Sequence, residues 1–238
     1  MNRTMHTPTG SPRQVLIFDA DDTLWENNIL FERVIDAYLD WVARPTLDRT
    51  RVRSLLDEVE AANALTHGYG SKVFVRSLGE TLERLNARPA TDAELRHIDE
   101  LAVVLLRNRV ELVPGVVETL TTLGARHDLM LLTKGDTEEQ QRKIDASALA
   151  HHFRSTHIVP EKGVDAYLDL TRAHDLVPAT TWMIGNSPKS DILPARGAGL
   201  GAVFIPNAHT WVLEQSELDP LDDRVLTLTA FPELLKHF

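Results

Sequence analysis

Short apolar runs that end in polar turns recur along this chain, and they restrict its fold more than any other feature. Five runs have this form, at residues 15–18, 129–132, 156–159, 182–184 and 202–205. Helix-like segments separate the later runs, for example 115–123 and 165–174. Because strands buried on both faces read as continuous apolar runs, this alternation predicts an α/β fold with a doubly wound parallel sheet. A weaker run at 225–228 predicts an edge strand before a short terminal helix near 231–235.

One long interval breaks the alternation. From residue 25 to about residue 112 the apolar residues follow helical spacing, as Leu30, Val34, Ile35 and Tyr38 do, and no convincing strand is present. Thr91 followed by Glu94 has the spacing of a capping box that opens another helix. The pattern predicts an all-helical domain at 25–112, inserted into a core domain formed by 14–24 and 113–238. Residues 1–13 are polar and are expected to form a flexible tail.

Composition excludes several classes of partner. The net charge is −10 and no run is rich in Lys or Arg, so neither nucleic acid nor an anionic membrane is an expected partner. The chain has no cysteine, which excludes disulfides, thiolate metal sites and cysteine nucleophiles. No stretch approaches the 18 apolar residues of a membrane span, and residues 1–13 lack the apolar segment of a secretory signal. The expected location is cytoplasmic.

Acidic, hydroxyl and basic side chains follow the apolar runs. They are Asp19, Asp21, Asp22 and Thr23 after the first run, Thr133 and Lys134 after the second, Lys162 after the third, and Asn186 and Asp191 after the fourth. Ligands of open parallel sheets bind beyond the carboxyl ends of the strands, so these side chains are expected to meet in one crevice. Two carboxylates about 4 Å apart repel by roughly 4 kcal/mol at an effective dielectric near 20. The three acids after the first run therefore predict that something compensates their charge.

Four segments carry a family resemblance. In order along the chain, "FDADDT", "LLTKG", "PEKG" and "GNSPKSDI" resemble the four motifs of the haloacid dehalogenase-like (HAD) hydrolase superfamily. The long gap between the first two motifs is similar to that of members with a helical cap, and the resemblance extends from Val15 to about Trp211. It implies a Rossmann-like core of the HAD type with a C1-type helical cap.

The resemblance also implies roles for particular residues. Asp19 would attack phosphorus and become an aspartyl phosphate. Asp21 would protonate the leaving alcohol and then deprotonate the hydrolytic water. Thr133, Lys134 and Lys162 would bind the phosphoryl oxygens and stabilise charge in the transition state.

A metal site is implied at the same place. Family mechanism places Mg²⁺ against the side chain of Asp19, the main-chain carbonyl of Asp21 and the side chain of Asp191, all of which offer the oxygen ligands that Mg²⁺ prefers. The last motif commonly begins Gly-Asp, whereas this chain has Gly185-Asn186. Asn186 is thus a further candidate ligand with one negative charge fewer.

The function that follows is Mg²⁺-dependent hydrolysis of a small phosphorylated metabolite. Dehalogenation of a haloacid is one alternative in the superfamily, but dehalogenases lack the second motif Asp because a halide leaves without a proton, so Asp21 argues against it. A sugar phosphomutase is another alternative, which only its products would distinguish. A non-catalytic member that binds a ligand is the third, and Asn186 keeps it open.

Two further expectations concern loops. The segment "THGYGSK" at 66–72 interrupts the helices of the insert, and Tyr69 and Lys72 within it are predicted to lie near the leaving group of the substrate. The alternative is that the segment is only a turn between helices. Asp22 is interpreted as a turn or capping residue, because the family often has Gly at that position.

Overall fold

The carboxyl ends of six parallel strands share one edge of a sheet in the computed structural model, which describes residues 13–43, 48–106 and 110–238. The strand order is β5-β4-β1-β6-β7-β8. The strands are β1 (Val15–Phe18), β4 (Asp128–Lys134), β5 (Ser155–Val159), β6 (Thr181–Gly185), β7 (Gly201–Phe204) and β8 (Val225–Thr227). Each apolar run expected to form a strand does so, and β8 is the edge strand.

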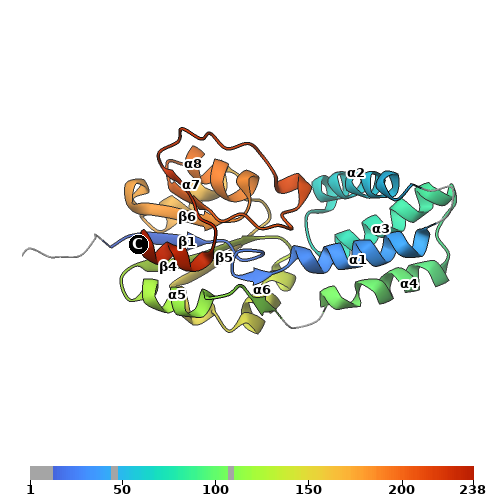
Figure 1. Ribbon diagram of the computed structural model, residues 1–238, viewed down its shortest axis with the longest axis horizontal. Helices are drawn as coiled ribbons and strands as arrows, with labels where there is room; N and C mark the ends of the chain where they lie inside the picture. The colour runs from blue at the N-terminus through green and yellow to red at the C-terminus, as the bar shows by residue number, and fades with distance from the viewer. Residues whose placement is uncertain (1–12, 44–47, 107–109) are drawn as a thin grey trace, which may run out of the picture.

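Helices cover both faces of this sheet (Figure 1). One face packs against α5 (Val116–Gly124), α6 (Thr137–Ser147) and the terminal 3₁₀ helix η6 (Phe231–Lys236), with Leu120, Ile144 and Phe231 buried around Phe18. The other face packs against α7 (Val164–Ala173) and α8 (Leu193–Gly197), which bury Tyr167. The α/β, doubly wound fold is therefore confirmed.

A helical insert leaves the sheet after β1. It consists of α1 (Asn28–Val42), α2 (Arg49–His67), α3 (Ser71–Asn86), α4 (Asp92–Ala102) and a 3₁₀ turn, η1 (Val103–Leu106). The four helices bury an apolar cluster of their own that includes Tyr38, Leu56, Leu78 and Ile98. Figure 1 shows these helices beyond the end of the sheet, beside the carboxyl ends of the strands. The capping box expected at the start of α4 is present, since Thr91 and Glu94 exchange both hydrogen bonds.

Two short strands correct the expectation that residues 25–112 contain none. β2 (Trp25–Glu26) and β3 (Glu111–Leu112) pair in antiparallel fashion, Trp25 opposite Leu112. β2 lies just before the insert and β3 just after it, so their pairing holds the two connections between the insert and the core side by side. A strand of two residues is too short to show the period-two alternation by which strands are recognised.

The loop within the insert is also shorter than expected. α2 continues to His67 and α3 begins at Ser71, so residues 68–70 alone connect them, in place of the expected 66–72. Gly68 and Gly70 both have positive φ angles, at 79° and 129°, which lets the chain reverse within three residues.

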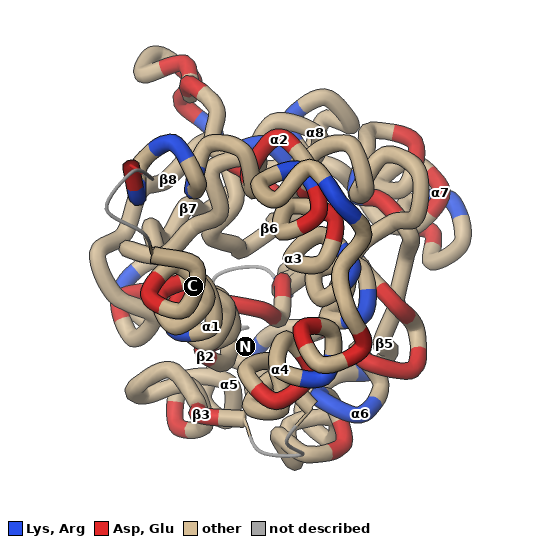
Figure 2. The backbone as a smooth tube through the Cα atoms, turned by 90° about the vertical axis from the view of Figure 1, so that its right-hand side faces the viewer, with Lys and Arg blue, Asp and Glu red and all other residues tan. Residues whose placement is uncertain are grey.

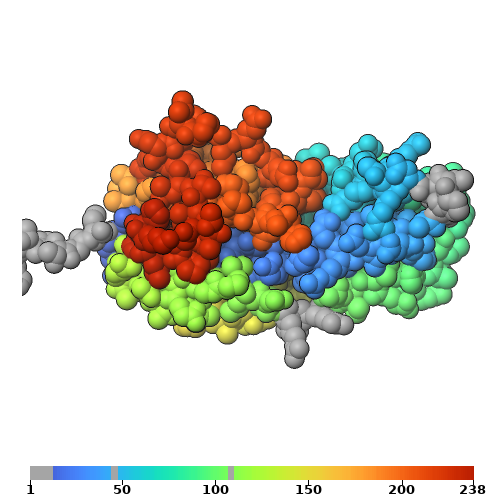
Figure 3. Space-filling model, viewed as in Figure 1, coloured from blue at the N-terminus to red at the C-terminus, as the bar shows by residue number. Residues whose placement is uncertain are grey.

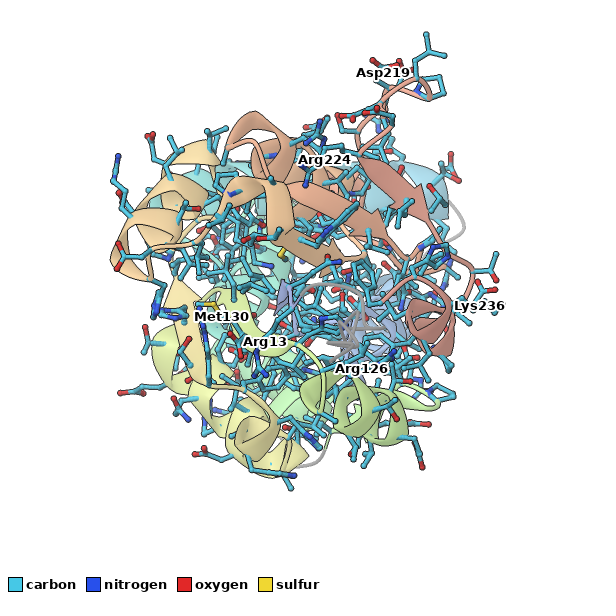
Figure 4. All side chains as sticks on the ribbon, turned by 90° about the vertical axis from the view of Figure 1, so that its left-hand side faces the viewer. Arg13, Arg126, Met130, Asp219, Arg224 and Lys236 are labelled. Carbon is cyan, nitrogen blue, oxygen red and sulfur yellow. The ribbon has the colours of Figure 1, made fainter. Side chains whose placement is uncertain are left out.

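The surface carries mixed charge. Figure 2, which looks at the molecule from the side of the insert, shows acidic and basic residues interspersed along the helices. After η5 (Val212–Glu214) a loop carries Asp219 away from the body of the protein (Figure 4). Within the residues that the structure describes, no helix has both the length and the apolar character needed to cross a membrane.

Candidate active site

A cavity of about 170 Å³ lies where the carboxyl ends of the strands face the helical insert. Among the residues that line it are seven of the predicted site residues: Asp19, Asp21, Thr133, Lys134, Lys162, Asn186 and Asp191. Tyr69 lines it from the insert. Lys72 is exposed on α3 and does not line this cavity, which α3 borders with Val73, Phe74 and Ser77.

Asp19 lies directly after β1, in the middle of the sheet. Its main-chain N–H donates to the carbonyl of Ile184 at 2.9 Å, which ties the residue to β6. Thr23 Oγ1 donates to Asp19 Oδ2 at 3.0 Å, and Lys162 Nζ donates to Oδ1. Burial and the neighbouring Asp191 carboxylate raise the pKa of Asp19, although Lys162 acts in the opposite direction. The site thus holds more negative charge than one ammonium neutralises.

Lys162 joins the two central acids. Its side chain is 2% exposed, and Nζ donates to Asp191 Oδ1 at 2.8 Å as well as to Asp19 Oδ1. Burial alone would lower the pKa of Lys162, but the attraction of Asp19 and Asp191 outweighs it and raises the pKa. The lysine is therefore a fixed positive charge between two buried carboxylates.

The loop after β6 positions Asp191. Ser187 accepts a hydrogen bond from the N–H of Ser190 and opens a short π-helical turn, Pro188–Ile192. The turn brings Asp191 back toward its own strand, where Oδ2 accepts a hydrogen bond from Ser187 N at 2.9 Å. A Cβ atom on Gly185 would lie 2.2 Å from Asp191 Oδ2, so only glycine leaves room for this carboxylate.

Asp21 has partners that sequence reasoning missed. Its carboxylate accepts hydrogen bonds from Trp25 Nε1 at 2.7 Å, Gln140 Nε2 at 2.8 Å and Lys143 Nζ at 2.9 Å. Burial raises the pKa of Asp21, but Lys143, together with the hydrogen bonds from Gln140 and Trp25, outweighs that effect and lowers the pKa overall. Gln140 and Lys143 are three residues apart on α6, which begins just after the second motif. This helical spacing, which places both side chains on one side of α6, is the sequence feature that could have indicated them.

Three other predicted residues surround this centre. Thr133 is the last residue but one of β4 and is 1% exposed on the wall of the cavity. Lys134 Nζ donates to Glu214 Oε1 at 2.6 Å and to Ser190 Oγ at 2.9 Å, so much of its charge is already neutralised. Asn186 Oδ1 accepts a hydrogen bond from Thr23 Oγ1 at 3.2 Å.

Asp22 and the insert loop have structural partners. Asp22, at a φ of 62°, accepts hydrogen bonds from the main-chain N–H groups of Asn27 and Asn28, both at 2.9 Å, where α1 begins. The interpretation of Asp22 as a turn or capping residue is therefore confirmed.

The start of α3 is fixed to the core by Glu139 on α6. Glu139 Oε2 accepts hydrogen bonds from both N and Oγ of Ser71, each 2.8 Å long.

The donor atoms at the centre suit Mg²⁺. Asp19, Asp191 and Asn186 offer hard oxygen ligands, and two buried carboxylates share a single ammonium, which leaves a deficit of positive charge. No group of three His, Cys, Asp or Glu side chains is placed to hold a metal among the described residues. The remaining ligands would then be main-chain or amide oxygens and water, a mixture that Mg²⁺ commonly accepts.

The fold and the cavity define a class of protein with a doubly wound α/β core, aspartates at the end of its first strand and a helical insert after them. The family model for haloacid dehalogenase-like hydrolases matches residues 14–199. This chain belongs to the haloacid dehalogenase-like hydrolase family.

Individual relatives support that assignment. A phosphoserine phosphatase of Thermus thermophilus is 29% identical over 153 residues, which are 62% of this chain and 58% of the relative. A solved haloacid dehalogenase-like family hydrolase from Xanthomonas campestris superposes with a TM-score of 0.79 at 25% identity and covers 96% of both chains. The L-2-haloacid dehalogenase of Xanthobacter autotrophicus shares the fold, with a TM-score of 0.62, 17% identity and coverage of 94% and 97%.

Proposed function

We propose that this protein is a Mg²⁺-dependent phosphatase that hydrolyses a small phosphorylated metabolite through an aspartyl phosphate on Asp19. The observation that carries the proposal is the second acid. Asp21 lines the same cavity as Asp19 and is held as a carboxylate by Lys143. Phosphate esters need a group that moves a proton to an alkoxide and from a water, whereas a departing halide needs none.

Each site residue has a defined role in the two steps of this reaction. One Asp19 oxygen attacks phosphorus, the P–O bond to the leaving group breaks, and the alcohol takes a proton from Asp21. Asp21 then accepts a proton from the water that attacks the aspartyl phosphate, which returns Asp19 as a free carboxylate and releases inorganic phosphate. Thr133 and Lys162 hold the phosphoryl oxygens. Bound at Asp19, Asp191, Asn186 and the Asp21 carbonyl, Mg²⁺ would reduce the repulsion between the phosphate and these carboxylates.

Lys143 has a part in this scheme. It keeps Asp21 ionised before the substrate binds, which prepares the residue for its second role as a base. The entry of a phosphate dianion adds negative charge beside Asp21 and so favours the protonated form that the first role requires. The pairing of Asp21 with Lys143 is therefore compatible with a residue that gains and loses one proton in each cycle.

The experiment is hydrolysis of an aryl phosphate by the purified protein, measured as release of inorganic phosphate. Activity is expected with Mg²⁺ and not in excess chelator, and Asp19→Asn is expected to reduce it to background. Asp99→Asn is the matched control, because Asp99 is exposed on α4 away from the cavity. Halide release from 2-chloropropionate, in a protein inactive on every phosphate ester, would favour the dehalogenase alternative. A product that retains phosphate on another hydroxyl would favour the mutase.

A further inference from the structure

The cavity continues past the catalytic residues and ends between the helices of the insert. Its walls at this end are mostly apolar and come from α1, α2 and α3, namely Phe31, Ile35, Ala64, Val73 and Phe74. Two acids lie among them, Glu32 on α1 and Glu60 on α2. An apolar chamber with carboxylates in its wall is unusual, because a buried charge is normally paired.

Glu60 is the unusual member of this set. Its side chain is buried, with the residue 8% exposed, and Oε2 has no hydrogen-bond partner in the part of the chain that the structure describes. Trp211, the residue before η5, donates a side-chain hydrogen bond to the Glu60 carboxylate, and η5 lies beside α2 (Figures 1 and 3). The pKa of Glu60 is raised to about 8, chiefly by burial; Arg53 and the hydrogen bond with Trp211 act to lower it, and Asp57 and Glu32 act to raise it. Among the described residues the Glu60 carboxylate therefore forms no ion pair of its own.

The cation that lowers the pKa of Glu60, Arg53, is paired with other carboxylates. Arg53 donates to both oxygens of Glu32 at 2.8 and 3.0 Å and to Asp57 Oδ1 at 2.8 Å. Three carboxylates thus share one guanidinium, and the third of them, Glu60, faces the cavity. Aromatic rings stand at the same end, with the Phe31 and Phe74 rings edge to face and their centroids 5.0 Å apart. A carboxylate beside aromatic faces is the combination that binds an organic ammonium group.

We propose that the inner end of the cavity binds a positively charged amine on the leaving group, so that the substrate is the phosphate monoester of an amino alcohol. This inference rests on the proposed phosphatase function and deepens it. The ammonium of the substrate supplies a counter-charge for Glu60, while the phosphate end reaches Asp19. Both groups line one cavity, so a single small molecule can contact both.

The same charges disfavour leaving groups that carry a carboxylate. The lysines that line the cavity, Lys134, Lys143 and Lys162, all belong to the core, and the insert contributes no Lys or Arg to the lining that the structure describes. A carboxylate placed between the helices would face Glu60 and Glu32 without a cation of its own. Electrostatic repulsion of like charges in a poorly solvated site is large enough to exclude it.

The test compares two esters that differ in charge but little in size, O-phosphoethanolamine and 2-hydroxyethyl phosphate. The wild-type protein is expected to give a kcat/KM ratio of roughly tenfold to a hundredfold in favour of O-phosphoethanolamine, the range of a hydrogen bond to a charged group. Phosphoglycolate, which carries a carboxylate, is expected to be slower than both. Equal values for the first two esters would overturn the proposal.

Two variants assign the preference to one side chain. Glu60→Gln keeps the size of the side chain and removes its charge, so the ratio is expected to fall toward unity. Glu58→Gln is the matched control, since Glu58 lies on the same helix but is exposed and outside the cavity. A ratio that survives Glu60→Gln would contradict the role of this residue.

A binding measurement separates this inference from the proposed function. The Asp19→Asn variant is titrated calorimetrically with O-phosphoethanolamine and with 2-hydroxyethyl phosphate. Tighter binding of the amine ester, in a protein whose wild type hydrolyses no phosphate ester, would support the amine site and reject the phosphatase. Hydrolysis of both esters at equal rates, with equal binding, would support the phosphatase and reject the amine site.

Discussion

Tyr69 Oη donates a 2.7 Å hydrogen bond to Glu161 Oε2, which joins the loop between α2 and α3 to the residue that precedes Lys162. The Tyr69 ring also lies edge to face with Trp211, at a centroid distance of 6.2 Å, and 4.1 Å from Lys134 Nζ. The insert therefore contacts the core beside the lysine that joins the two central acids. A loop so placed can close the cavity and exclude water when a substrate is bound.

Tyr69→Phe is expected to keep the ring contacts and remove the hydrogen bond to Glu161. Loss of one such bond is worth about 1 kcal/mol. Turnover should therefore fall a few-fold, with relative rates among substrates changed because the loop borders the leaving group. Lys72→Ala is the control, and an effect of Lys72→Ala as large as that of Tyr69→Phe would contradict this arrangement. Steady-state kinetics on several phosphate esters makes the comparison.

Lys143→Met is expected to reduce turnover at least tenfold, because Asp21 would lose the cation that keeps it ionised in a buried site. The same change should slow the second half of the reaction, in which Asp21 acts as a base. Arg142→Met, next to it on α6 but exposed, should leave the rate unaltered. Equal rates for Lys143→Met and the wild type would remove Lys143 from the mechanism.

Gly185→Ala is expected to abolish most activity, because the new methyl group would overlap Asp191 Oδ2 and push the carboxylate away from Lys162. The Mg²⁺ concentration needed for half-maximal activity should rise as well. Gly163→Ala serves for comparison, since a Cβ atom there would meet no other atom within 4 Å. Normal activity and normal Mg²⁺ dependence in Gly185→Ala would show that the position of Asp191 is unimportant.

Glu60→Gln is expected to stabilise the protein in a pH-dependent way. The pKa of Glu60 is raised from the ordinary 4.5 to about 8, so between these values the folded state holds a proton that the unfolded chain releases. Stability therefore falls as the pH rises through this range, by about 1.4 kcal/mol for each unit of pKa shift expressed. Arg53 reduces this penalty, while Asp57 and Glu32 increase it.

Denaturant unfolding at two pH values checks this expectation. The wild type and Glu60→Gln should differ little near pH 4.5, whereas the variant should be the more stable at pH 8. A wild type as stable as the variant at pH 8 would mean that Glu60 already has a counter-charge. A residue that lowers stability and raises selectivity is what a binding site retains for function.

Much of the fold follows from local sequence pattern. The runs at 15–18 and 129–132 are continuous and apolar because the central strands β1 and β4 are buried on both faces. The grouping of Asp19, Lys162 and Asp191 could be expected, since each follows a strand and parallel strands share one carboxyl edge. Their chemical roles and the assignment of residues 25–112 to a separate domain stay predictions.

Other features depend on contacts between distant segments and leave little trace in the sequence. Lys143 is 122 positions from Asp21, and only the packing of α6 on the sheet brings them together. Glu60 reads as one more acid on a charged helix, because its burial depends on the segments packed around α2 and not on its local sequence. Lys72 looked equivalent to Tyr69 in the same loop, but α3 begins at Ser71 and helical geometry carries Lys72 away from the cavity.

In the proposed mechanism Asp19 forms an aspartyl phosphate and Asp21 moves the protons, and the Asp21→Asn variant separates these two roles. Rapid mixing of this variant with an aryl phosphate should give a burst of about one phenolate per active site followed by slow turnover, since a phenolate leaves unaided but water still needs a base. The rate of the first step should fall far more for alkyl esters than for aryl esters. The expected decrease lies within the roughly 10²–10⁴-fold range of such proton transfer. Equal losses on both kinds of ester, with no burst, would contradict the account.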